Sequence, residues 1–142
     1  MMNTFTNLLF WLHFIGLGMG VGGGIALSQV GPRLNSEQGS ALDLAWSLEV
    51  VFSRVATLGI VILLITGPLM VWLKFGGLQA FNWWFNLKMV FVGLAVIGAT
   101  VHAYAGRRFR DGRGEYRLME ISGRLAGGGM LAAMLCAVFT FN

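Results

Sequence analysis

Four long apolar segments constrain the fold of this 142-residue chain more than any other feature of its sequence. They cover about residues 8–30, 48–73, 83–105 and 118–141. Each has the roughly 20 residues that an α-helix needs to cross the hydrocarbon core of a bilayer. Composition agrees, because 11% of the residues are charged, against roughly a quarter in soluble domains. The sequence therefore predicts an all-α integral membrane protein.

The connections between these segments predict one domain spanning residues 1–142. The run GPRLNSEQGSALD after the first segment is typical of a turn followed by a short polar stretch, and KFGGLQAFN after the second is a tight connection. The first segment has no basic flank and no small-residue cleavage site, so we interpret it as a retained helix. Short connections make successive helices antiparallel neighbours, which predicts an up-down bundle of four transmembrane helices.

Basic residues predict the orientation of this bundle. The loop after the third segment lies on the same side as Arg33, whereas the opposite side carries Lys74. The positive-inside rule then places the arginine-rich loop in the cytoplasm and both termini on the periplasmic side. Topology and anionic lipid headgroups also explain the net charge of +4, and nothing resembles a nucleic-acid-binding module. The loop arginines are Arg107, Arg108, Arg110, Arg113 and Arg117.

Two ionisable residues stand inside the apolar segments at matching depths. His13 follows the start of the first segment by five residues, and Lys88 follows the start of the third by five, which is roughly 7–8 Å at about 1.5 Å per residue. Such groups are costly in lipid unless they face a partner, a cofactor or water. Because neutral imidazole is a common iron and copper ligand, His13 with Lys88 is the candidate metal and cofactor site. The alternative is that neither residue binds a cofactor: His13 would hydrogen-bond across the bundle, and the Lys88 side chain would extend outward toward the membrane surface.

His102 belongs to a second polar layer, about 20 Å deeper by the same rise, so we expect that it cannot share one iron with His13. Glu49 and Arg54, expected in the first turns of the second helix, could pair across helices with Arg124 or with Glu120. One interpretation is a structural ion-pair cluster. The other is a guanidinium site, formed by Arg54 and Arg124, for an anionic group of a cofactor.

Glycines recur at four-residue spacing in the first and fourth segments. Gly16, Gly20 and Gly24 share one helix face, as do Gly123 and Gly127. Small residues at this spacing let helix backbones approach closely in lipid. The alternative is that Gly16 and Gly20 make room for a flat ligand such as a porphyrin.

Short stretches spread over most of the chain carry a resemblance to a known family. They are WLHFIG with His13, GPRL with Pro32 and Arg33, SLEVVFSRV with Glu49 and Arg54, FNLK with Lys88, HAYAGR with His102 and Arg107, and YRLMEIS with Arg117 and Glu120. In their order they resemble the four-helix bacterial membrane protoporphyrinogen IX oxidases of the HemJ type and, more distantly, the copper-resistance D membrane domains.

The resemblance implies a haem b or porphyrin site in a bacterial inner-membrane protein, with His13 as the iron ligand. Lys88 would be a second ligand when neutral or a cation for a propionate when charged. It also implies protoporphyrinogen oxidation, with electrons passed onward to an acceptor such as quinone. Two alternatives remain. One is a non-catalytic structural or assembly subunit, whose glycine faces dock on a larger complex or a second copy. The other is a metal or proton transporter with a His13–Lys88 relay.

Overall fold

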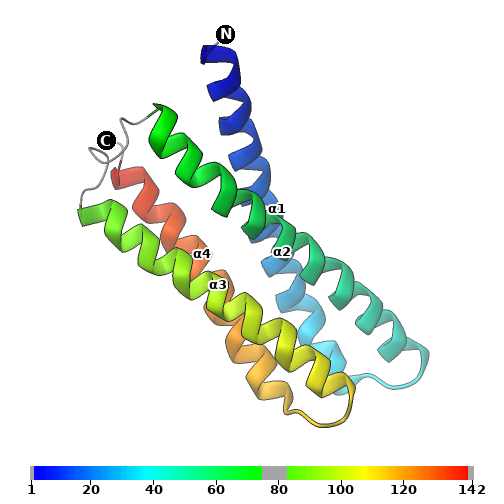
Figure 1. Cartoon of the computed structure of the whole chain (residues 1–142). Helices are drawn as coiled ribbons and strands as arrows, with labels where there is room; N and C mark the ends of the chain where they lie inside the picture. Colours follow the sequence, from blue (N-terminus) through cyan, green and yellow to red (C-terminus); the bar gives the residue numbers. More distant parts are fainter. Residues whose placement is uncertain (1, 75–82, 141–142) are drawn as a thin grey trace.

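The computed structural model describes residues 2–74 and 83–140, which form four long α-helices in up-down order (Figure 1). All four are long and apolar enough to cross a membrane, so the prediction of an all-α four-helix membrane bundle is confirmed. Most of the expected KFGGLQAFN connection lies outside the described residues. The helices are α1 (Met2–Ser36), α2 (Ser40–Lys74), α3 (Trp83–Arg110) and α4 (Tyr116–Thr140).

At the arginine-rich end of the bundle, the helices extend beyond the apolar segments identified in the sequence. The predicted turn at GPRL is wrong, because α1 continues through Pro32 to Ser36. Proline in a helix sacrifices one backbone hydrogen bond, but Val30 and Leu34 on either side of it are buried in the core and hold this last turn in place. Likewise α2 begins at Ser40, so Glu49 is its tenth residue and does not lie in its first turns.

Two glycines with positive φ form the connections at this end of the bundle. Gly39, with φ of 61°, lies in the connection between α1 and α2, and Gly112, with φ of 69°, ends α3. At Gly112 the amide donates to the carbonyl of Phe109 over 3.0 Å, and the amide of Arg113 donates to that of Arg108 over 2.9 Å. This pair of bonds is a Schellman motif, whose left-handed residue is usually glycine.

The bundle is built from two tightly packed helix pairs, α1 with α2 and α3 with α4 (Figure 1). The pairs meet mainly through α1 and α4, whereas α2 and α3 make few contacts. Glycines allow the close approach within the first pair, since an ideal Cβ at Gly16 would lie 3.0 Å from the Gly59 carbonyl oxygen and one at Gly23 would lie 2.8 Å from the Ala56 Cβ. The predicted close helix contact at Gly16 is thereby confirmed.

The buried core lies toward the end where α1 joins α2 and α3 joins α4. Its centre is Met119, which is 1% exposed. Aromatic side chains surround it, including Trp46, Phe109 and Tyr116. This apolar core packs the ends of all four helices together and so fixes the rotation of each helix about its axis. The buried core residues in this cluster are Val30, Leu34, Ala45, Ala105 and Met119.

Candidate functional site

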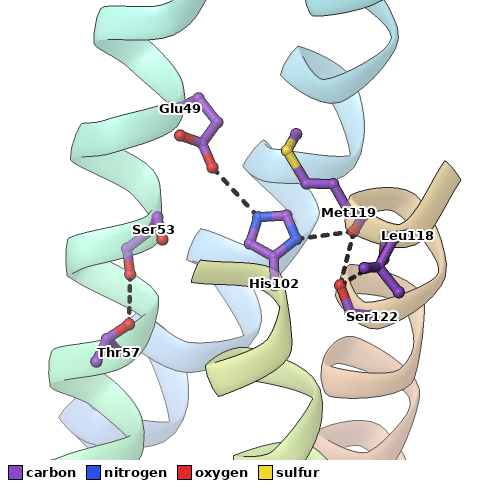
Figure 2. Close-up of polar contacts among 7 residues, drawn as sticks. All are labelled: Glu49, Ser53, Thr57, His102, Leu118, Met119 and Ser122. Carbon is purple, nitrogen blue, oxygen red and sulfur yellow. Dashed lines mark hydrogen bonds and ion pairs between the residues drawn. The ribbon is translucent and has the colours of Figure 1, made fainter. Parts of the chain in front are cut away.

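A buried histidine joins α2, α3 and α4 beside this core. His102 projects from α3 and lies between Glu49 of α2 and the backbone of α4 (Figure 2). Its Nδ1 is 2.9 Å from the carbonyl oxygen of Met119, and its Nε2 is 3.2 Å from Oε1 of Glu49. Both His102 and Glu49 are less than a tenth exposed. Because α2 and α3 otherwise make few contacts, this pair is the main polar connection between them among the described residues.

The hydrogen-bond pattern determines how many protons this site holds. A carbonyl oxygen only accepts, so Nδ1 of His102 carries a hydrogen. The contact between Nε2 and Glu49 requires one more proton between them, carried either by the imidazole or by the carboxyl group. Both arrangements leave the pair neutral overall, which is the charge state that a low-dielectric interior favours.

Glycines on α3 and α4 make room for the pair. An ideal Cβ at Gly123 would lie 3.1 Å from Nδ1 of His102, and one at Gly106 would lie 3.8 Å from Oε1 of Glu49. Ser122 adds a hydroxyl that donates to the carbonyl oxygens of Leu118, over 2.7 Å, and Met119. The Met119 carbonyl therefore accepts hydrogen bonds from both a ring nitrogen and a hydroxyl.

The arginines of the predicted inner layer do not pair with Glu49. Arg124 pairs with Glu120 on its own helix at 2.7 Å, and its side chain is 79% exposed. Arg54 is exposed. The expected pairing of Glu49 with Arg124 or Glu120 is therefore wrong. Glu49 contacts His102 instead, because the rotation of α3 brings the imidazole to that position.

His13 occupies a second polar position toward the other end of the bundle. Its Nδ1 is 2.8 Å from Oγ1 of Thr66, and that hydroxyl donates its hydrogen to the carbonyl oxygen of Ile62 over 2.7 Å. The hydroxyl can therefore only accept from the ring, so Nδ1 of His13 carries the hydrogen and Nε2 of the neutral ring keeps its lone pair. Gly67 leaves space beside the ring, since an ideal Cβ there would lie 3.7 Å from Cε1.

Lys88 lies near His13, as the matching depths predicted. It is half-buried on α3, and its charge acts on the His13 ring and on the buried Cys136 of α4. The hydrogen bond between His13 and Thr66 joins α1 to α2 at this level, and the electrostatic interactions of Lys88 place α3 and α4 nearby. Within residues 2–74 and 83–140, no three His, Cys, Asp or Glu side chains are grouped closely enough to hold a metal ion.

The two histidines lie far apart along the bundle. They contact α2 at Thr66 and Glu49, seventeen residues apart, which is about 25 Å along a helix axis. The expectation that they cannot share one iron within a single chain is consistent with this spacing. Sequence reasoning did not identify Thr66 or the Met119 carbonyl as their partners, since a hydroxyl one turn after an isoleucine and a backbone oxygen carry no distinctive pattern.

A cavity of about 370 Å³ lies between the helix pairs, on the side of His102. Of the predicted cofactor residues, Gly20 and Arg124 line it, and His13, Lys88, Arg54 and Gly16 do not. The structure therefore divides the predicted site between two depths. No family model, no curated protein and no solved structure matches this chain.

Proposed function

We propose that this chain is a membrane redox protein that binds haem b or a related porphyrin, with His13 as the iron ligand. The observation that carries the proposal is the hydrogen bond from Nδ1 of His13 to Thr66, which leaves Nε2 with its lone pair. Metal-ligating histidines commonly donate their other ring nitrogen to a protein acceptor, which fixes the tautomer and the ring orientation. His102 lacks this property, because both of its ring nitrogens are engaged.

Lys88 completes the proposed site. Its charge reaches His13, and its amine would ligate iron when neutral or offset a propionate when charged. The residues fit the donor chemistry of a haem, which supplies the electron transfer when bound. The cavity of about 370 Å³ starts deeper, at Gly20. The porphyrin would therefore be held outside it, and two copies of the chain could each contribute one His13 to a shared iron.

The resemblance to the HemJ-type oxidases suggests the reaction and the location. The reaction would be protoporphyrinogen oxidation or electron transfer to quinone. The location would be the bacterial inner membrane, with the arginine-rich loop in the cytoplasm and both termini in the periplasm. Arg107, Arg108 and Arg110 in the last turn of α3 support this orientation.

The test is a reduced-minus-oxidised visible spectrum of detergent-purified protein expressed with ample haem. We expect b-type bands that disappear in His13→Ala. Thr66→Val should weaken haem retention, because the ring loses its acceptor, whereas Thr66→Ser should preserve it. His102→Ala is the matched control. In protein that circular dichroism shows to be folded, this variant should keep the b-type bands. Unchanged bands in a folded His13→Ala protein would refute the assignment of the ligand.

The second candidate is a non-catalytic structural or assembly subunit. It is favoured by the use of several glycines in close helix packing: an ideal Cβ at Gly59 would lie 2.6 Å from the Gly16 carbonyl oxygen, and one at Gly98 would lie 2.6 Å from the Ala126 nitrogen. Those glycines are explained without a ligand. A colourless protein that purifies only together with other subunits would support this candidate over the haem protein.

A further inference from the structure

The cavity between the two helix pairs is separate from the residues of the proposed haem site. It is bounded toward the outer end where Met130 of α4 packs over Gly20 of α1, and toward the arginine-rich end where the Tyr116 hydroxyl approaches Gly31. Its volume of about 370 Å³ falls within the range of small-molecule sites. Ile25 and Leu131 line it and are each at least half exposed. Because these two apolar side chains face lipid in a membrane, the cavity adjoins the acyl chains.

The space depends on glycines that serve no packing role. An ideal Cβ at Gly24, Gly127 or Gly128 would meet no atom within 4 Å, although all three residues line the cavity. By contrast, Gly16 and Gly59 lie against neighbouring backbone. The cavity walls are therefore kept open by residues whose side chains would fill it.

The charges around the cavity cancel. Arg124 is neutralised by Glu120 at 2.7 Å, and His102 shares one proton with Glu49. Since an uncompensated charge is costly beside lipid, this lining suits a ligand with no net charge.

Residues with hydrogen-bonding side chains line the cavity on opposite helices. On α4, the Tyr116 hydroxyl and the Arg124 guanidinium can donate. On α1, the Ser28 hydroxyl donates to the carbonyl oxygen of Ile25 over 2.6 Å. On α2, the Thr57 hydroxyl donates to the carbonyl oxygen of Ser53 over 2.8 Å (Figure 2). Because both hydroxyls have used their hydrogens, their oxygens can only accept from a ligand. A ring that carries carbonyl or hydroxyl groups on opposite edges would match both walls.

We propose that this cavity binds the head ring of a quinone or quinol, with its apolar tail leaving between α1 and α4 into the bilayer. The ring is flat, neutral and polar at two opposite edges, and the tail suits the opening beside Ile25 and Leu131. The proposal rests on the cavity and not on haem binding, so haem-free protein should bind the ring as well.

The test measures binding of radiolabelled decylubiquinone to the full chain in lipid nanodiscs, with empty nanodiscs subtracted. Gly24→Leu and Gly127→Leu should each weaken binding about tenfold or more, because the new side chains occupy the cavity. Gly18→Leu and Gly22→Leu are the matched controls and should change it less than about twofold. Both meet open space as well, but they lie outside the lining. Equal binding by all four variants would overturn the proposal.

Two further measurements separate a quinone site from other possibilities. Decylbenzene, which has the tail and ring without oxygens, should fail to displace the label, and Tyr116→Phe should weaken decylubiquinone binding severalfold. Displacement by decylbenzene at equal concentration would overturn the proposal in favour of a site for lipid chains. His13→Ala should leave quinone binding intact, so failure of the haem proposal and failure of the quinone proposal give different results.

Discussion

Breaking the pair formed by Glu49 and His102 should reveal how the two helix pairs are held together. The contact joins α2 to α3, which otherwise touch little, and its side chains are only 8% and 10% exposed. The perturbation is a double-mutant cycle of Glu49→Ala and His102→Ala, with Glu49→Gln as the conservative variant. The cycle isolates the pair because each single change removes the same contact.

The structure sets the expected magnitude between two limits. Losing one partner of a buried charged pair costs about 3–5 kcal/mol in soluble proteins. Polar pairs between membrane helices average about 0.6 kcal/mol, with a maximum near 1.7. The burial favours a high value, but the separation of 3.2 Å is long for a charge-assisted bond. We therefore expect a coupling free energy of about 1–2 kcal/mol. Glu49→Gln should cost less than about 1 kcal/mol, since its amide can still donate to Nε2.

The assay is reversible unfolding in mixed micelles by sodium dodecyl sulfate, followed by the loss of helical circular dichroism. The matched control is the cycle for Glu120 and Arg124, a contact within α4 whose arginine is largely exposed. Its coupling should not exceed about 0.5 kcal/mol. If the Glu49–His102 coupling were equally small, the pair would contribute nothing specific to the assembly of the two helix pairs, and the reasoning would fail.

Three further outcomes follow from the fold. Gly59→Leu should destabilise the bundle by at least about 1–3 kcal/mol in the same unfolding assay because it forces α1 and α2 apart, whereas Gly22→Leu meets open space and should change stability little. Gly112→Ala should cost about 1 kcal/mol because φ is 69° there; Gly112→Asn should recover part of the loss, and an equal cost for both would contradict the left-handed cap. In a Cys136→Ser background, Asp111→Cys should react with an impermeant maleimide in inverted vesicles and not in intact cells; the reverse pattern would overturn the orientation.

Hydropathy was sufficient to predict four helices but not their ends. Apolar composition decides which residues enter lipid, so residues 8–30 were correctly assigned to a helix. The helix itself continues to Ser36, because its end depends on the packing of Leu34 in the core and on the turn at Gly39. Because those contacts involve other helices, the end of α1 cannot be predicted from the residues around it alone.

Depth was predictable from the sequence, but helix rotation was not. Counting residues from the helix ends opposite the arginine-rich loop placed His13 and Lys88 at one depth, because rise per residue is nearly constant, and the two interact electrostatically in the structure. The partner of Glu49 depends on which face α3 turns toward α2. That rotation follows from the summed packing of all four helices, so His102 could not be chosen over Arg124 before the structure was known.

The glycines show why one sequence pattern has two physical results. Gly16, Gly20 and Gly24 have equal spacing, yet the first two lie against Gly59 of α2, whereas the third faces the cavity and an ideal Cβ there would meet no atom within 4 Å. Figure 1 shows that α1 and α2 are inclined to each other. Their close contact still includes Gly23, where an ideal Cβ would lie 2.8 Å from the Ala56 Cβ, so Gly24 differs from Gly16 and Gly20 in the direction it faces. Small residues that face the partner helix bring backbones together, and small residues that face the other helix pair leave a space. The cavity therefore needs glycine on a second face of α1, and a chain with glycine only on the face toward α2 would have the contact without the cavity.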